Sequence, residues 1–415
     1  MKKIAVIGGG ASGLIAAYYA SENEENSVTV FEKNDIAGKK LRITGNGRCN
    51  YSNEDLSISH YEHSFGMSEP DFFDSMALED NLKLIQNVIG EDGTKEFTDF
   101  LEKCGILSCN HKGCLYPYSE RAKEMTDIIY NVLCRKGVAF KFNSDIKEIA
   151  DNEDGSFTIL NEKFDRVILC CGGKAAPKTG SDGGGFKIAR AFGHTTSYTY
   201  PVLVPLTIDD AIGSRLAGIR VKGKVTAIVD KSVLSSAEGE IQFTEHTISG
   251  IPTFQLSRRM TKPLEEKSDC IISCDFLPFL KTENIASFVD LRIANLGNLE
   301  PLELFRGILP DQIYEYLYEE FLKVDYHETY DSDSAAIRFL KYLKDYRLQI
   351  LGHGGYNDAQ CTRGGVLLTE ITDTLESKFV PGLFFAGEML DVDGDCGGYN
   401  LQWAFSSGKV AGENV

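Results

Sequence analysis

The first 32 residues hold the feature that most constrains the fold of this chain. An apolar run at 4–7 leads directly into the glycine-rich turn 8–13. A helix-like segment at 14–20 then precedes a second apolar run at 28–31. This order predicts a strand, a tight turn, a helix and a second strand. Such a unit is typical of proteins that bind a dinucleotide, so the sequence predicts a dinucleotide site near its N-terminus.

The residues of the turn have separate roles in binding the pyrophosphate of a dinucleotide. Gly8 provides the backbone angles, Gly10 lets main-chain N–H groups approach the phosphates, and Gly13 lets the helix pack closely on the strand. The helix N-terminus adds a partial positive charge. The carboxylate of Glu32, 19 residues after Gly13, suits an adenosine ribose. The nucleotide contacts expected here are those of Gly8, Gly10, Ala11, Ser12, Gly13, Glu32 and Lys33.

Charge and hydropathy limit the partners of this chain. Its 43 Lys and Arg residues stand against 61 Asp and Glu residues, and the net charge of −18 disfavours nucleic acid and anionic membranes as partners. No apolar run approaches the roughly 18 residues that span a bilayer. The strand at 4–7 leaves no room for a signal peptide. We therefore expect a cytoplasmic protein that is a monomer or a homodimer.

The cysteines indicate free thiols. There are eleven, an odd number, and several stand inside apolar runs, which is typical of a reducing cytoplasm and not of a disulfide framework. One group has spacings that suggest zinc but lacks a Cys-x-x-Cys pair, so no metal site is expected. Its members are Cys104, Cys109, His111 and Cys114.

The C-terminal region holds a second motif that suits the same extended cofactor. An apolar strand at 382–386 ends in Gly387 and Glu388, and a glycine-rich stretch precedes a helix at 401–410. The carboxylate of Glu388 suits a ribityl hydroxyl, and the glycines allow close approach of an isoalloxazine ring. The N-terminus of the last helix would stabilise negative charge on the reduced ring. The expected contacts are Gly387, Glu388, Gly397, Gly398, Tyr399, Asn400 and Leu401.

Cofactor motifs at opposite ends imply that the middle of the chain is inserted into one nucleotide-binding domain. An apolar strand at 167–171 is followed by two glycines, and the pattern of apolar and polar residues changes from Thr195 onward. The region that follows is first β-rich and then helical, acidic and aromatic. The predicted division is an α/β domain at 1–194 and 356–415, a β-rich insert at 195–257 and 326–355, and a helical insert at 258–325.

Five segments carry a resemblance to a known family, and the resemblance extends over nearly the whole chain. They are Gly8-x-Gly10-x-x-Gly13, GNGRCN at 45–50, GGKAAPKTGSDGGG at 172–185, FTEHTISGIPTFQLS at 243–257 and GLFFAGEMLDVDGDCGGYNLQWAFSSG at 382–408. The chain resembles the BaiN-like NAD(P)/FAD-dependent oxidoreductases of the glutathione-reductase-type flavoprotein superfamily. This implies a Rossmann-like FAD-binding domain with an inserted β-barrel-like module and a helical module. It also implies reduction of carbon–carbon double bonds conjugated to a ketone, as in bile acids.

The loop at 45–50 departs from this family, which often has three consecutive glycines before the arginine. Asn46 tolerates left-handed backbone angles, so we expect the turn to be kept. Lys40 and Arg48 are candidates to approach the phosphates or the flavin. Cys49 has no partner at Cys-x-x-Cys spacing, which favours a packing role over a redox role. The further cofactor contacts expected are Lys40, Asn46, Gly47, Arg48, Cys49, Asn50, Gly172 and Gly173.

The sequence does not single out a proton donor. The candidates for proton transfer are Tyr399, Arg363, His246 and His353, of which the first three are the predicted catalytic residues. The favoured function is hydride transfer from NAD(P)H through flavin N5 to an activated C=C bond of a hydrophobic organic substrate. No second complete GxGxxG unit exists, so NAD(P)H would visit the flavin face and leave. A flavin-dependent amine oxidase or dehydrogenase and a non-catalytic flavin-binding sensor or interaction protein are the alternatives.

Overall fold

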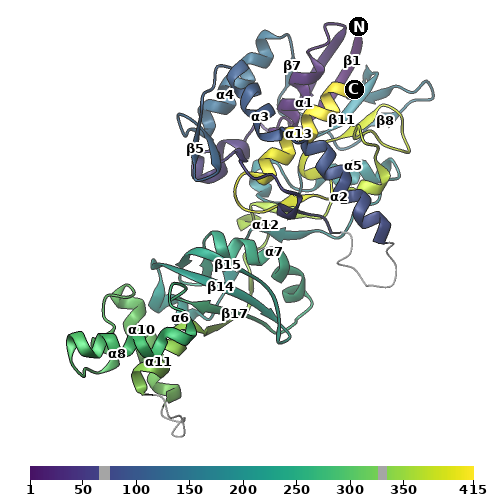
Figure 1. Cartoon of the computed structure of the whole chain (residues 1–415). Helices are drawn as coiled ribbons and strands as arrows, with labels where there is room; N and C mark the ends of the chain where they lie inside the picture. The colour runs from purple at the N-terminus through teal and green to yellow at the C-terminus, as the bar shows by residue number, and fades with distance from the viewer. Residues whose placement is uncertain (65–74, 326–333) are drawn as a thin grey trace. The chain divides into compact units, whose positions relative to one another are not determined.

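The protein consists of two compact units (Figure 1). The computed structural model describes residues 1–64, 75–325 and 334–415. The first unit is discontinuous in sequence and consists of Met1–Pro201 and Ala359–Val415. The second unit is the segment between them, Val202–Asp358. The residues predicted to bind a nucleotide therefore all lie in the first unit.

A five-stranded parallel sheet forms the centre of the first unit. Its strand order is β21-β11-β1-β2-β7. The strands end level with one another, because Ile7 pairs with both Phe31 and Leu169. Leu169 in turn pairs with Phe385. The carboxyl ends thus form one edge, which is where open α/β sheets bind ligands. The strands are β1 (Lys2–Ile7), β2 (Asn26–Phe31), β7 (Ala139–Lys141), β11 (Arg166–Leu169) and β21 (Leu383–Phe385).

Both faces of this sheet are covered, which explains its continuous apolar runs. Ile4 and Val6 of β1 pack into one core with α1, α3 and α4. Ala5 and Ile7, which point to the other face, pack with α2 and α5. The predicted α/β class is therefore confirmed. The helices of this unit are α1 (Ala11–Ala20), α2 (Ser75–Ile89), α3 (Gly93–Lys103), α4 (Ala122–Arg135), α5 (Gly184–Ala191) and α13 (Tyr399–Asn414).

Helix packing joins the two ends of the chain, and Figure 1 shows α1 beside α13. An ideal Cβ on Gly408 of α13 would lie 2.6 Å from the carbonyl oxygen of Ser12 in α1. No real side chain fits at that distance, so glycine lets the two backbones touch.

In the described part of the chain, four small sheets complete the first unit. One contains β3 (Ser52–Asn53), β6 (Cys114–Pro117) and β5 (Ser108–His111), and a second contains β4 (Tyr61–Glu62) and β22 (Asp393–Gly394). A third contains β12 (Tyr200–Val202) and β20 (Cys361–Arg363), and the fourth contains β8 (Ala150–Asp151), β9 (Phe157–Ile159) and β10 (Glu162–Phe164).

The second unit contains an antiparallel sheet with the order β18-β17-β14-β15-β16-β13-β19. Ile272 of the sheet and Phe339 of a helix belong to one hydrophobic core, so the sheet and the helices form a single unit. The strands are β13 (Leu206–Thr207), β14 (Arg220–Val229), β15 (Ser232–Phe243), β16 (Thr247–Ser249), β17 (Cys270–Asp275), β18 (Tyr346–Gln349) and β19 (Gly352–His353). The helices are α6 (Asp210–Leu216), α7 (Ile251–Glu265), α8 (Ile285–Leu296), α9 (Pro301–Leu304), α10 (Asp311–Asp325), α11 (Ala335–Lys344) and α12 (Gly355–Asp358).

Two elements correct the predicted inserts. Strand β17 lies within the range 258–325 that was predicted to be helical, and it pairs with β14 on one side and β18 on the other. Helix α11 lies within the range 326–355 that was predicted to be β-rich. Residues 326–333 of that range are outside the described residues. Among the helices that the structure describes, none is both long and apolar enough to cross a membrane.

Candidate nucleotide-binding site

The glycine-rich turn is tightly packed at its first and third motif glycines and open at the second. Gly8 has a φ of +106°, and a Cβ there would lie 2.4 Å from the carbonyl oxygen of Cys170. A Cβ on Gly13 would lie 1.9 Å from the carbonyl oxygen of Gly8. Around Gly10, by contrast, no atom lies within 4 Å of the Cβ position. The turn therefore keeps its shape through Gly8 and Gly13 and leaves space at Gly10, where a ligand can approach the backbone.

The N-terminus of α1 presents free amide groups at this open position. Gly10 is the N-cap residue, and no side chain among the described residues caps the helix there. The first intrahelical bond runs from the amide of Leu14 to the carbonyl of Gly10, at 3.0 Å. The amides of the first turn, including those of Ala11 and Ser12, and the helix dipole suit an anion. The residues present thus fit the pyrophosphate of a dinucleotide.

The carboxylate of Glu32 is fixed at the end of β2, beside the turn. The side chain is buried, and its Oε2 accepts a hydrogen bond from the amide of Gly9 at 2.8 Å. Its Oε1 accepts bonds from the amide and the side chain of Asn34, at 2.8 and 2.7 Å. An ionised carboxylate has about four acceptor positions, so one remains for a ribose hydroxyl. Lys33 forms an ion pair with Asp182 at 2.7 Å.

The C-terminal motif contacts the N-terminal turn directly. A Cβ on Gly387 would lie 2.4 Å from Oγ of Ser12. The peptide of Gly387 is held on both sides, because its N–H donates to Ser407 Oγ at 2.9 Å and its carbonyl accepts from Trp403 Nε1 at 3.1 Å. Trp403 is buried, as expected for a core residue. The two predicted cofactor motifs, from opposite ends of the chain, therefore meet at one place.

Three distant segments converge on Glu388. Its Oε2 forms an ion pair with Lys40 Nζ at 2.8 Å, and its Oε1 accepts from the amide of Thr362 at 2.7 Å. Oγ1 of Thr362 accepts from the amides of Lys174 and Ala175, at 2.8 and 2.9 Å. Lys40 and Glu388 were both predicted to contact the cofactor. Thr362 was missed, because only the tertiary structure places β20 beside this motif.

The glycine cluster after β11 holds a buried hydroxyl group without a partner. Gly172 has a φ of +71°, and a Cβ there would lie 2.9 Å from Oγ of Ser181. Within the described parts of the chain this Oγ finds no hydrogen-bond partner. A Cβ on Gly173 would lie 2.5 Å from Oγ1 of Thr362. Because buried hydroxyl groups are nearly always bonded, an unpaired one in this cluster fits a bound polar ligand.

The loop at 45–50 keeps the turn that was expected from Asn46, whose φ is +55°. Cys49 is fully buried, and burial raises the pKa of its thiol to about 12, which agrees with a packing role. Arg48 points toward the β5–β6 hairpin, where its Nε lies 2.6 Å from Glu120 Oε2. Its predicted contact with the cofactor stays a prediction, as do those of Gly47 and Asn50.

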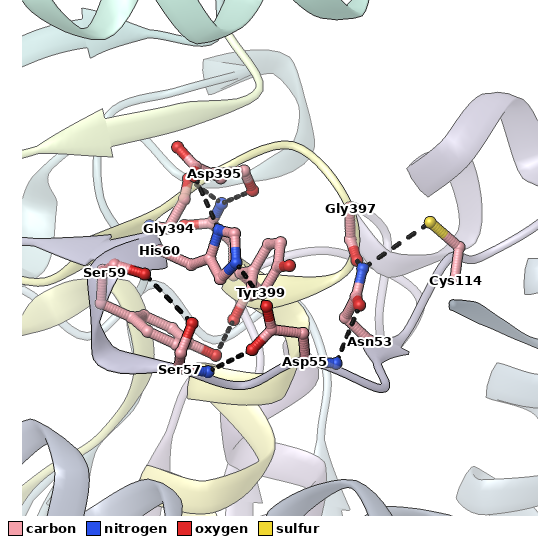
Figure 2. A network of polar contacts seen from close by, with 12 residues as sticks. Asn53, Asp55, Ser57, Ser59, His60, Cys114, Gly394, Asp395, Gly397 and Tyr399 are labelled. Carbon is pink, nitrogen blue, oxygen red and sulfur yellow. Dashed lines mark hydrogen bonds and ion pairs between the residues drawn. The ribbon is translucent and has the colours of Figure 1, made fainter. Parts of the chain in front are cut away.

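The start of α13 is held by a network around His60 that sequence analysis missed (Figure 2). The His60 ring stacks on the ring of Tyr399, with centroids 4.4 Å apart. Its Nδ1 lies 2.9 Å from Asp395 and its Nε2 lies 3.2 Å from Asp55. Burial raises the pKa of Tyr399. The phenol predicted to be catalytic is therefore a weaker acid than free tyrosine, and it lies beneath an imidazole ring.

The residues around Tyr399 fasten the glycine-rich stretch before α13. Asn53 Nδ2 donates to the carbonyl of Gly397 at 3.1 Å. The side-chain amide of Asn400 exchanges two hydrogen bonds with the backbone of Gly394, at 2.8 and 2.9 Å. The N-cap residue Gly398 has a φ of +98°, and no described side chain caps the helix. The N-terminus of α13 thus presents free amides, as the predicted electrostatic role requires.

Two buried acidic groups lie behind this stretch. Asp393 Oδ1 accepts from Nε of Arg363 at 2.8 Å, and Glu62 accepts from its Nη2 at 2.5 Å. Arg363, a predicted catalytic candidate, is thus buried between carboxylates. Asp391 accepts hydrogen bonds from the amide and hydroxyl groups of Ser64, and burial raises its pKa to about 6. A carboxyl group that titrates near neutral pH is a candidate proton carrier that sequence analysis missed.

The two histidine candidates lie in the second unit. The side chain of His246 is 66% exposed and forms an ion pair with Asp210 at 2.8 Å, which raises its pKa. Nε2 of His353 lies 3.6 Å from Glu265, and burial lowers the pKa of this histidine. Each is paired within its own unit, and the catalytic role of His246 stays a prediction.

Comparisons with known proteins show the family of this chain. The model of the HI0933-like protein Rossmann domain matches residues 2–414. The chain is 34% identical over 419 residues to the 3-dehydro-bile acid delta(4,6)-reductase of Clostridium scindens, covering 99% of this chain and 98% of that protein. It is 27% identical over 426 residues to the ribosomal RNA dihydrouridine synthase of Escherichia coli, covering 99% and 97%.

A solved structure shares the fold. The 3-ketosteroid delta1-dehydrogenase from Sterolibacterium denitrificans, in complex with 1,4-androstadiene-3,17-dione, aligns with a TM-score of 0.50 over 100% of this chain and 99% of that one. The two chains are 12% identical, so the comparison shows the fold alone.

Proposed function

The chain belongs to the HI0933-like Rossmann-domain family, as its sequence resemblance predicted, and from this premise we propose that it is an FAD-dependent oxidoreductase that reduces a C=C bond conjugated to a carbonyl group. The observation that carries the proposal is the contact between Ser12 and Gly387, which joins the two cofactor motifs at the carboxyl edge of the parallel sheet. An extended dinucleotide is the ligand that requires both motifs at once.

The residues of the first unit have distinct roles in this proposal. The amides at the start of α1 bind the pyrophosphate, Glu32 accepts from the adenosine ribose, and Glu388 accepts from a ribityl hydroxyl. The uncapped N-terminus of α13 stabilises negative charge at the pyrimidine edge of the ring. When bound, FAD supplies hydride transfer at its N5 atom. The electron donor proposed is NAD(P)H, which visits the flavin face.

The substrate class proposed is a hydrophobic enone. The Clostridium scindens relative is named for reduction of delta(4,6) double bonds in a 3-dehydro-bile acid. The name of the Escherichia coli relative favours a second candidate, a uracil base in RNA, whose C=C bond is also conjugated to a carbonyl. The net charge of −18 favours the small molecule, because RNA-binding surfaces are basic. The predicted absence of a nucleic-acid partner stays a prediction.

The test is an anaerobic titration of the purified protein, loaded with FAD, with NADH and with NADPH. We expect at least one donor to bleach the flavin absorbance and a 3-oxo-Δ4 steroid to restore it, with formation of the saturated ketone. Restoration by a uridine-containing ribosomal RNA fragment alone would support the second candidate. In a separate aerobic assay, rapid peroxide formation with an amine and O₂ would indicate an oxidase. A protein that takes up no FAD, even after refolding with excess cofactor, would overturn the proposal.

A further inference from the structure

A group of three potential metal ligands lies on the β5–β6 hairpin and the turn that follows it. The thiol of Cys109, the imidazole of His111 and the carboxylate of Glu120 each offer one ligand atom, and these atoms lie within 4.8 Å of one another. The sulfur of Cys109 is 3.7 Å from Nε2 of His111. The same Nε2 is 2.5 Å from Oε1 of Glu120. None of the three is among the residues expected to contact the nucleotide.

The local fold explains why these side chains meet. Cys109 and His111 are two residues apart in strand β5, so they point to the same face of the hairpin. The chain returns in β6 and turns at Glu120, whose φ is +49° and whose amide donates to the carbonyl of Pro117 at 2.8 Å. This turn brings the carboxylate back over the hairpin. The sequence spacing of Cys109 and His111 gives no indication of Glu120, because the third ligand comes from a turn.

The third ligand is already oriented by a second side chain. Nε of Arg48 lies 2.6 Å from Oε2 of Glu120, and its guanidinium group lies 4.8 Å from the centre of the Tyr116 ring. Arg48 therefore holds one carboxylate oxygen and leaves the other, Oε1, directed at His111. Metal-binding carboxylates are commonly held in this way by a hydrogen bond to their free oxygen.

We propose that Cys109 Sγ, His111 Nε2 and Glu120 Oε1 form a site for one divalent cation of the zinc type, with water as the fourth ligand. Sulfur, imidazole nitrogen and carboxylate oxygen are the ligands that zinc prefers, and tetrahedral coordination separates such atoms by about 3.4–3.6 Å. The observed sulfur–nitrogen distance of 3.7 Å agrees with this separation. The nitrogen and oxygen atoms move apart by about 1 Å when the cation replaces their hydrogen bond.

Charge and proton balance support the site. Binding releases the thiol proton of Cys109 to solvent. The His111 ring gives up the Nε2 proton that it donates to Glu120 and, as a neutral imidazole, carries its one proton on Nδ1. The thiolate and the carboxylate then balance the two charges of the cation. His111 is exposed and Cys109 and Glu120 are partly exposed, so the site is open to a cation from solvent.

The site is tested by titrating the full-length protein with Co²⁺ and following difference absorption spectra, in which the flavin contribution cancels. We expect a near-ultraviolet sulfur-to-cobalt charge-transfer band that saturates at one equivalent and is displaced by Zn²⁺. Cys109→Ser should abolish this band. His111→Gln and Glu120→Gln, which alter exposed or partly exposed side chains, should weaken Co²⁺ binding by about tenfold or more.

Cys134→Ser is the matched control, because Cys134 is an exposed thiol outside the group, and its band should be unchanged. A band that persists in Cys109→Ser, that disappears in Cys134→Ser, or that never forms would overturn the proposal. If Cys109→Ser does not fold, Zn²⁺ must still raise the melting temperature of the wild type and not that of His111→Gln. An equal rise in both proteins would equally exclude the site.

Discussion

At the scale of single residues, two acidic side chains of the C-terminal motif have different surroundings and therefore suit different roles. Glu388 is half-buried and is bonded to the ammonium group of Lys40 and the amide of Thr362. Asp391 is fully buried and is bonded to Ser64, and burial raises its pKa to about 6. A carboxylate with a cationic partner is suited to binding, whereas a carboxyl group that titrates near neutral pH is suited to carrying a proton.

Replacing Glu388 with Gln is expected to weaken FAD binding by about tenfold or more, because a hydrogen bond to a charged group contributes about 1.5–3 kcal/mol. Quenching of flavin fluorescence on binding measures the Kd. Glu162→Gln is the matched control, because it removes an exposed carboxylate that pairs with Lys141. The same Kd in both variants would contradict a role of Glu388 in the site.

Replacing Asp391 with Asn is expected to change how stability depends on pH. The pKa of Asp391 rises from an ordinary 3.8 to about 6, so the folded protein binds this proton more tightly than the unfolded chain. The resulting stabilisation is fully present below about pH 4 and is lost as pH rises through about 6, roughly 3 kcal/mol in all.

Because Asn does not ionise, the stability of Asp391→Asn relative to the wild type should rise from pH 4 to pH 7. Denaturant unfolding of both proteins at several pH values measures the difference. If the free energies of unfolding of the two proteins change in parallel between pH 4 and pH 7, Asp391 does not titrate in this range.

At the scale of elements, different glycines of the turn between β1 and α1 maintain its backbone shape and leave room for the ligand. Gly13 has no room for a Cβ, because the carbonyl oxygen of Gly8 would lie 1.9 Å away, whereas Gly10 has open space around it. The backbone of Gly10 also has an ordinary negative φ of −78°, which alanine adopts without strain. Substitution of Gly13 is therefore expected to disturb the fold, whereas substitution of Gly10 is expected to disturb only ligand binding.

Gly10→Ala is expected to keep the melting temperature of the protein without cofactor and to lose most of its affinity for FAD, since the methyl group occupies the space of the phosphates. Gly13→Ala is expected to destabilise the protein by about 1–3 kcal/mol or more, because the helix must move away from the strand. Thermal unfolding and flavin binding, measured on both variants, distinguish the two effects. A lower melting temperature of Gly10→Ala together with normal FAD affinity would contradict the role of Gly10 in ligand binding.

At the scale of the whole molecule, the nucleotide-binding unit is made of two separate stretches of sequence. Strand β21 and helix α13, from the C-terminal stretch, pair with β11 and pack on α1. Strands β12 and β20 pair with each other where the chain leaves this unit and returns to it. The insert is thus attached at two neighbouring points, so a short linker is long enough to replace it.

Replacing residues 204–357 with a short Gly/Ser linker is expected to leave a folded protein that binds FAD and does not turn over substrate. The expected FAD contacts all lie outside the removed segment. Circular dichroism and flavin absorbance provide the measurements. Removal of 383–415 is the comparison and should abolish folding, because it deletes a strand of the central sheet and a packed helix. A folded but colourless linker variant would place part of the cofactor site in the insert.

Local sequence was sufficient for the elements and contacts that depend on neighbouring residues. The turn at 8–13, the apolar strands and the left-handed Asn46 follow from backbone sterics and side-chain periodicity, which act over a few residues. The ion pair between Lys40 and Glu388 was anticipated only to the extent that both belonged to motifs for one ligand. Strand β17 was missed, because it is only six residues long and lies between two helices, α7 and α8.

The amino-acid sequence by itself determined the family, the α/β class and the two cofactor motifs, because each is recognised from short continuous segments of the chain. The tertiary structure alone decided which distant residues meet: Thr362 at Glu388, His60 on Tyr399, and Glu120 at the thiol of Cys109. It also decided that Asp391 is buried deeply enough for its pKa to reach about 6. The physical reason is that burial and side-chain contact depend on residues that come together only when the whole chain folds, which no local pattern records.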